Sequence, residues 1–188
     1  GTGLLGFKKK HPKHIFDVGI AEGHAVSMAG GLAKQGMIPV VALYSTFLQR
    51  SYDMILQDVA MLHLHVVFAV DRAGLVGEDG ETHHGIYDIG FLRHAPGMMV
   101  LCPASLQEQR EMLHWAVKEY DGPVAVRYPR GGNRGITASG WNGNDSVLCH
   151  KKGDALTFIT YGTITDNVLQ AAQVLAEQGI EVTVLRLL

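Results

Sequence analysis

A lone carboxylate stands between two apolar stretches near the start of the chain. In FDVGIAEGHAVSMAGGLA, residues 16–33, Glu22 follows a strand-like run and precedes a helix-like segment. Carboxylates stabilise helix N-termini, which could explain this residue without any chemistry. The segment after it is small and apolar on nearly every side, so we expect the start of the helix to be buried. A partly desolvated carboxylate needs a hydrogen-bond donor, and a ligand nitrogen could be that donor.

Aromatic and basic side chains follow the next apolar run, in YSTFLQRSYDMILQDVA. Tyr44 ends the run, Phe47 lies at the start of a predicted helix and Arg50 follows one turn later. Phe47 and Arg50 therefore share a helix face and can line the same cleft. Two interpretations of each residue are open: Phe47 stacks on a planar ring or belongs to the core, and Arg50 lines the cleft or is an ordinary surface charge.

The loop DRAGLVGEDGETHHG holds seven charged or histidine residues between its glycines: Asp71, Arg72, Glu78, Asp79, Glu81, His83 and His84. Polar loops after buried strands are often plain surface loops, but long loops at a sheet edge also carry binding groups. Neighbouring histidines cannot easily ligate one ion together, and no third ligand has a zinc-like spacing, so we predict no metal site. We expect a histidine that binds substrate or transfers protons.

The stretch RYPRGG places Arg127 and Arg130 on either side of Tyr-Pro at the end of another apolar run. The forked donors of arginine suit phosphate or carboxylate groups. The alternative is a structural salt bridge, which we expect for one of the two.

Apolar runs and helix-like segments alternate along the chain, and they must position these side chains. The strands are predicted at Phe16–Ile20, Ile38–Leu43, Val66–Ala69, Met99–Cys102 and Val124–Tyr128, and the helices at His24–Gln35, Phe47–Met61, Leu106–Glu119 and Asn167–Gln178. Strands that are apolar throughout indicate a sheet covered by helices on both faces, hence an α/β fold with a mostly parallel sheet. Ligands of such sheets bind at the carboxyl ends of the strands.

A second α/β unit is predicted after a segment rich in glycine, asparagine and serine. We assign residues 1–135 to the first domain, 136–153 to a linker and 154–188 to the start of the second domain. The chain opens without a strand and stops at the end of one, so we expect a fragment of a longer protein.

Composition narrows the possible partners. Of the 188 residues, 47% are hydrophobic and the formal net charge is -2, without a basic stripe, so we expect no nucleic-acid partner. Neither a signal peptide nor an apolar run of bilayer length is visible, so we expect no membrane partner. Cys102 and Cys149 have no CxxC pairing and indicate reduced thiols in a cytoplasmic protein. No GxxxxGK[ST] or GxGxxG motif occurs.

Four stretches together resemble a known family. FDVGIAEGHAV, VALYSTFLQRSYDMILQDVA, VDRAGLVGEDGETHHGIYDIGFLR and GPVAVRYPRG are similar to the pyrimidine-binding domain of thiamine-diphosphate-dependent, transketolase-like enzymes. The STFLQR and DRAGLVGEDGETHHG stretches resemble the 1-deoxy-D-xylulose-5-phosphate synthase family in particular. The part from about residue 154 is similar to the start of the transketolase C-terminal domain.

This resemblance implies a transferase. Such an enzyme decarboxylates pyruvate on thiamine diphosphate and joins the two-carbon unit to D-glyceraldehyde 3-phosphate, for isoprenoid, thiamine and pyridoxal phosphate synthesis. A homodimer and Mg²⁺ are also implied. The family's GDG…N motif for Mg²⁺ and the diphosphate is not found, so we expect those ligands in a missing N-terminal domain and expect the fragment alone to be inactive.

The resemblance also implies roles for single residues. Glu22 would bind the ring nitrogen of the cofactor's aminopyrimidine, and Phe47 would stack on that ring. The substrate channel would be lined by Tyr44, Arg50, Arg72, Asp79, His83 and Arg130. Arg72 and Arg130 would bind the phosphate. His83 and Asp79 would bind the substrate's carboxylate or hydroxyl groups and transfer protons. Gly23 and His84 stand where the family commonly has glutamine.

Two alternatives remain open from the sequence. One is a related enzyme, a transketolase or the β subunit of a 2-oxo acid dehydrogenase, because the AE.HA pattern is shared across the superfamily. The other is a non-catalytic dimerisation module, although a pure interface has no use for Glu22, Phe47, His83 and Arg130 together.

Overall fold

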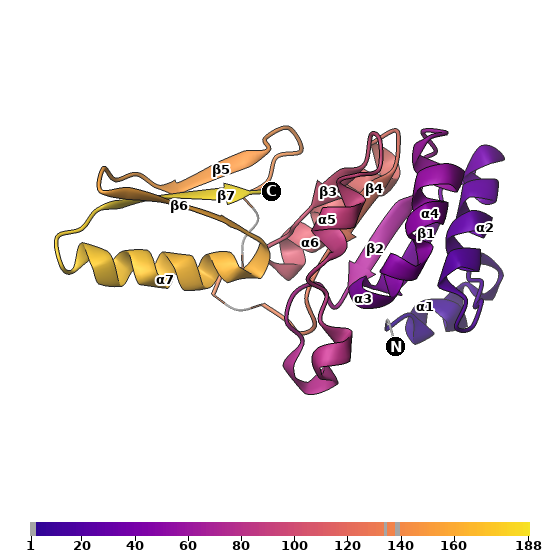
Figure 1. Ribbon diagram of the computed structural model, residues 1–188, viewed down its shortest axis with the longest axis horizontal. Coiled ribbons are helices and arrows are strands. Elements are labelled where there is room, and N and C mark those ends of the chain that lie inside the picture. The colour runs from indigo at the N-terminus through magenta and orange to yellow at the C-terminus, as the bar shows by residue number, and fades with distance from the viewer. Residues whose placement is uncertain (1–2, 134, 138–139) are drawn as a thin grey trace.

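The computed structural model describes residues 3–133, 135–137 and 140–188. The chain folds into two β-sheets with helices against each (Figure 1). The first sheet has the strand order β1-β2-β4-β3 and is parallel throughout, with β1 at Val40–Tyr44, β2 at Val67–Asp71, β3 at Met99–Leu101 and β4 at Val124–Arg127. The predicted α/β fold with a mostly parallel sheet is thereby confirmed.

Helices cover both faces of the first sheet. They are α2 (Glu22–Lys34), α3 (Ser45–Leu48), α4 (Tyr52–Met54), α5 (Asp88–Leu92) and α6 (Leu106–Lys118), joined by the 3-10 turns η2 (Gln49–Ser51), η4 (Gly77–Asp79) and η5 (Glu81–His83) and by the π-helical η3 (Ile55–Ala60). The helix α1 (Leu5–Lys10) and the 3-10 turn η1 (Pro12–His14) precede them and bury no residue. Phe68 and Val70 of β2 pack with residues of α2 and η3, whereas Val67 packs with α6. Every residue of β2 is buried, because alternate side chains enter different cores.

The second sheet has the order β5-β7-β6, and α7 (Thr165–Ala176) lies along it after the turn η6 (Gly162–Ile164) (Figure 1). β6 (Leu156–Tyr161) and β7 (Val182–Leu187) are parallel, and β5 (Val147–Lys151) runs antiparallel to β7.

The segment predicted as a linker, 136–153, contains the strand β5, which the sequence did not reveal. The register with β7 shifts between Cys149 and Lys151, and this irregularity interrupts the alternation that signals a strand. Residues 138 and 139 of the predicted linker, and residues 1, 2 and 134 of the first predicted domain, lie outside the described residues.

The predicted strand Phe16–Ile20 is wrong. These residues form neither strand nor helix, and Phe16 and Ile20 are exposed. The Asp17 carboxylate accepts a hydrogen bond from the Gly19 N–H at 3.2 Å, and Gly19 has a φ of +68°. A side chain that bonds its own backbone two residues on favours a turn over an extended strand.

The predicted helix Phe47–Met61 begins earlier, at Ser45, and is not one regular helix. It passes through α3, η2 and α4 into the π-helical η3. This stretch packs tightly on α2, since a Cβ atom added at Gly30 would lie 2.6 Å from the carbonyl oxygen of Asp58. Gly30, in the second half of α2, therefore permits the close approach of this helix to η3.

A buried ion pair joins the second sheet to α6. Arg186 of β7 donates to both carboxylate oxygens of Glu108, each at 2.7 Å, and both side chains are almost completely buried. Ser105 caps α6 by accepting from the Glu108 N–H, and the Glu108 carboxylate accepts from the Ala104 N–H. The arrangement is similar to a capping box, except that the carboxylate accepts from the residue before the N-cap Ser105. Within the described ranges, no helix has the length and apolar character needed to cross a membrane.

Candidate functional site

Glu22 is the first residue of α2 and is buried, as the apolar sequence after it predicted. Arg50, in η2, donates a hydrogen bond from Nη1 to Glu22 Oε1 at 3.0 Å. The carboxylate therefore lies where the helix dipole favours negative charge and has a cationic donor beside it.

Three rings gather next to this ion pair. Tyr44 and Phe47 are stacked, with ring centroids 5.7 Å apart and planes at 13°. His83 meets Phe47 edge-on, with the centroids at 5.3 Å, and Tyr44 at 6.4 Å. Tyr44 ends β1, Phe47 lies in α3 and His83 ends η5, so three separate elements supply the rings at the carboxyl edge of the sheet.

The guanidinium of Arg50 links Glu22 to these rings. Its Cζ atom lies 5.2 Å from the centroid of Phe47, while Nη1 bonds Glu22. A planar group that donates N–H to a carboxylate and contacts an aromatic ring is thus held between Glu22 and Phe47. The same pair of side chains can hold a flat nitrogen heterocycle by the same two interactions.

Arg72 occupies an uncommon backbone conformation, with a φ of +60°. Asp71 supports it by accepting from the Arg72 N–H at 2.7 Å and from Nη1 at 2.8 Å, and the guanidinium lies 4.4 Å from the centroid of Tyr44. Burial lowers the pKa of Arg72, but the hydrogen bond and charge of Asp71, together with Asp79, outweigh this and leave the pKa raised. Arg72 is therefore a fixed cation.

Asp79 bridges Arg72 and Arg130, the two arginines for which the family resemblance implies phosphate binding. Its carboxylate accepts from Arg72 Nε at 3.2 Å and from Arg130 Nη1 at 3.0 Å. Arg130 also forms an ion pair with Glu78, from Nη2 to Oε2 at 3.0 Å. Residues on the loops after β2 and β4 thus converge at one edge of the sheet.

Arg127 has a structural role, as expected for one of the two arginines in RYPRGG. Its Nε and Nη2 atoms donate to Asp88 at 2.8 and 3.1 Å, and both side chains are buried. Nη2 also reaches the carbonyl of Gly85 at 3.5 Å, and the guanidinium faces the Tyr161 ring of the second sheet at 5.6 Å. Burial lowers the pKa of Arg127, and the bond and charge of Asp88 more than reverse this.

The loop that carries Asp79 and His83 is closed at its base. Gly74 and Gly85 exchange two backbone hydrogen bonds, at 2.7 and 2.8 Å. The His84 ring turns back into the loop, where Nδ1 accepts from the Val76 N–H at 3.1 Å. His83 Nδ1 and the Thr82 hydroxyl are 3.0 Å apart. His83 therefore faces the rings while His84 holds the loop.

Every predicted site residue contacts another one. Glu22, Arg50, Phe47, Tyr44, Arg72, Asp79 and Arg130 form a continuous chain of contacts, and His83 joins it through Phe47 and Tyr44. The sequence assigned no role to Asp71, Glu78 and Thr82, which orient Arg72, Arg130 and His83. Their place in the DRAGLVGEDGETHHG loop was the available signal, but loop sequence does not specify which carboxylate meets which arginine.

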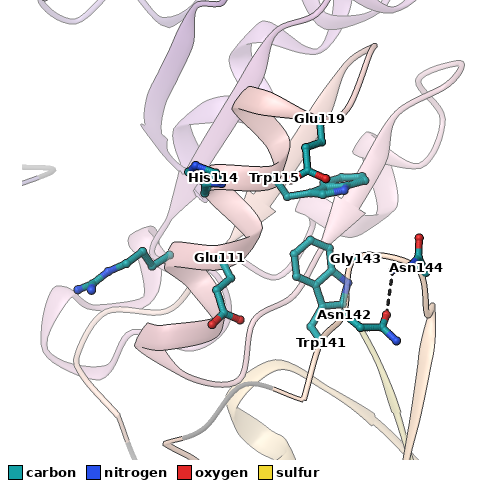
Figure 2. A pocket seen from close by; sticks show the side chains of 9 residues that line it. Glu111, His114, Trp115, Glu119, Trp141, Asn142, Gly143 and Asn144 are labelled. Carbon is teal, nitrogen blue, oxygen red and sulfur yellow. Dashed lines mark hydrogen bonds between the residues drawn. The ribbon is translucent and has the colours of Figure 1, made fainter.

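An open pocket of about 520 Å³ lies elsewhere, against the outer side of α6. Figure 2 shows Trp141 directed edge-on toward Trp115, with Glu111, His114 and Glu119 along the helix. None of the predicted site residues lines this pocket. We place the candidate site at the sheet edge because charged and aromatic groups converge there, whereas in the pocket the two tryptophans pack on each other.

Comparisons with known protein families and solved structures point to transketolases. Residues 1–134 match the family model of the transketolase pyrimidine-binding domain, and residues 145–188 match that of the transketolase C-terminal domain. A solved structure described as a split-gene transketolase, an inactive β4 tetramer, superposes with a TM-score of 0.83 at 29% identity, covering 96% of this chain and 59% of that one.

Curated relatives are more similar in sequence. The 1-deoxy-D-xylulose-5-phosphate synthase 1 of Geobacter sulfurreducens is 50% identical over 98% of this chain and 29% of its own length. The 1-deoxy-D-xylulose-5-phosphate synthase of Rippkaea orientalis is also 50% identical, over 98% of this chain and 30% of its own. The chain thus spans about 30% of the length of these relatives.

Proposed function

The chain belongs to the transketolase family through its pyrimidine-binding domain, and we propose that it forms part of a 1-deoxy-D-xylulose-5-phosphate synthase. This transferase decarboxylates pyruvate and joins the two-carbon unit to D-glyceraldehyde 3-phosphate, which yields 1-deoxy-D-xylulose 5-phosphate and CO₂ for isoprenoid, thiamine and pyridoxal phosphate synthesis. The names and 50% identity of the curated relatives support this reaction over that of a transketolase.

One observation carries the proposal: a planar N–H donor lies between the Glu22 carboxylate and the Phe47 ring. In this structure the donor is the Arg50 guanidinium. The aminopyrimidine of thiamine diphosphate is also planar and rich in nitrogen, so these residues fit it. Glu22 would hold a proton between its carboxylate and a ring nitrogen, and Phe47 would support the ring face. When bound, thiamine diphosphate supplies the electron sink that decarboxylation of pyruvate requires.

The remaining site residues suit the two substrates. Arg72 and Arg130 provide forked donors for the phosphate of D-glyceraldehyde 3-phosphate. His83 lies against the Phe47 ring, and Asp79 lies between Arg72 and Arg130. We assign to these two residues the binding of substrate hydroxyl or carboxylate groups and the transfer of protons. We also assign Tyr44 and Arg50 to the substrate channel. Tyr44 contacts Phe47 and Arg72, and Arg50 contacts Phe47.

Other parts of the site are proposed to come from protein outside residues 1–188. We assign the diphosphate and Mg²⁺ ligands to that part, by the family resemblance. A homodimer is proposed on the same ground, and a solved relative is described as a tetramer. Cys102 and Cys149 are free thiols, which supports a reducing compartment such as the cytoplasm.

The test is an assay of the complete enzyme of which we propose residues 1–188 are a part. With thiamine diphosphate and Mg²⁺, we expect product from pyruvate and D-glyceraldehyde 3-phosphate, measured by NMR. Activity only with a ketose phosphate donor in place of pyruvate would favour a transketolase. A purified, folded protein that binds no thiamine diphosphate and turns over neither donor would favour a non-catalytic module.

A further inference from the structure

The two arginines proposed for phosphate recognition are already surrounded by carboxylates. Arg72 contacts Asp71 at 2.8 Å and Asp79 at 3.2 Å, and Arg130 contacts Asp79 and Glu78, each at 3.0 Å. Three formal negative charges therefore face two positive ones. Carboxylates and phosphates use the same guanidinium donors, so an incoming phosphate has to compete with these side chains.

Glu78 differs from the other two carboxylates in how it is held. Asp71 and Asp79 are mostly buried and both contact Arg72. The Glu78 side chain is 84% exposed, and among the described residues it forms an ion pair with Arg130 alone. It lies on the short turn η4, which is bounded by Gly77 and Gly80, both with positive φ. An exposed pair of this kind contributes little to stability and is readily separated. Glu78 is thus the carboxylate that an anionic ligand displaces most easily.

We propose that Glu78 sets the affinity of the site for the phosphorylated substrate. Its carboxylate occupies Arg130 Nη2 and adds negative charge beside the place where the phosphate binds, so it weakens binding of the aldehyde phosphate without contacting the groups proposed for pyruvate and the cofactor. Glu78 is a specificity-determining residue in this sense, and its assignment rests on the proposed function of Arg130.

The variant Glu78→Gln in the complete enzyme tests this proposal. Gln keeps the size of the side chain and removes its charge. We expect the KM for D-glyceraldehyde 3-phosphate to fall about two- to fivefold, the range for an exposed ion pair. The KM values for pyruvate and for unphosphorylated D-glyceraldehyde should not change. The fall should shrink as the salt concentration is raised from about 0.05 to 0.5 M, because salt screens exposed charges.

Glu81→Gln is the matched control. Glu81 lies on the neighbouring turn η5 of the same loop, is exposed, and forms no ion pair with Arg72 or Arg130 among the described residues. We expect it to leave every KM unchanged. An equal fall in both variants would overturn the proposal, because the effect would then be one of net charge alone. An equal effect on the phosphorylated and unphosphorylated aldehydes would also overturn it.

Binding of inorganic phosphate, measured by calorimetry, separates this proposal from the proposed reaction. Phosphate should bind Glu78→Gln about two- to fivefold more tightly than the unaltered protein, whichever aldehyde the enzyme accepts. Failure of the synthase assay with tighter phosphate binding would refute the reaction and leave the role of Glu78 intact. Unchanged phosphate binding in Glu78→Gln would refute the role of Glu78.

Discussion

Arg186 and Glu108 are 78 positions apart in sequence, yet they form a bidentate, almost fully buried ion pair between the second sheet and α6. Removing one partner of such a pair leaves an unpaired buried charge. We therefore expect Glu108→Gln to lower the free energy of unfolding by about 3–5 kcal/mol, measured by denaturant titration. The partly exposed pair Lys151–Glu181 is the control, and Glu181→Gln should cost about 1 kcal/mol or less. Equal losses would contradict the buried-charge explanation.

Glu22→Gln is expected to abolish turnover in the complete enzyme. The amide keeps the shape of the side chain, but it no longer provides a negative charge to hold a proton on the cofactor ring. Among the described residues, the Glu22 side chain makes one polar contact, to the largely exposed side chain of Arg50, so the fold should persist and circular dichroism should be unchanged. Normal product formation by this variant would refute the role proposed for Glu22.

Arg130→Ala is expected to raise the KM for D-glyceraldehyde 3-phosphate about 10- to 100-fold, since hydrogen bonds to charged groups contribute about 1.5–3 kcal/mol. The KM for pyruvate should change far less. Arg110→Ala serves as the control, because Arg110 is exposed on α6 beside the tryptophan pocket. Equal effects of Arg130→Ala on both substrates would count against phosphate binding at this position.

Tyr128 should titrate late. Burial, and then the charge of Asp71, raises its pKa to about 12 from the usual value of 10, although Arg72 acts in the opposite direction. The folded state therefore retains the phenol proton longer than the unfolded state does. Its contribution to stability is complete below about pH 10 and is lost as the pH rises toward 12. Absorbance at alkaline pH should show a late tyrosine transition that Tyr128→Phe removes, and a titration unchanged by this substitution would contradict the assignment.

The sequence predicted much of the first sheet because its strands are apolar throughout and its helices have clear apolar patterns. β2 and α6 differ from prediction by only a residue or two. Phe16–Ile20 was mistaken for a strand because its composition is apolar, while the Asp17–Gly19 turn that prevents pairing is a local polar effect. β5 was missed because its pairing with β7, rather than its own pattern, defines it.

Residues of the site could be nominated from sequence, but their contacts could not. The motifs pointed to Arg72, Asp79 and Arg130, yet the bridge through Asp79 depends on how two loops fold against each other. Arg127 and Arg130 look equivalent in RYPRGG, and only the packing around Asp88 distinguishes the buried structural cation from the accessible one. Such pairings depend on tertiary geometry that short-range sequence patterns do not contain.

The order of the strands in the first sheet has a consequence for synthesis on the ribosome. β4 lies between β2 and β3, although it follows both in the chain, and β3 pairs with β4 alone. A nascent polypeptide that stops short of Val124 therefore leaves one edge of β2 and all of β3 without a neighbour, and such edges attract other chains. Chaperones should bind arrested chains of this length more strongly than chains in which Arg127 has already left the exit tunnel.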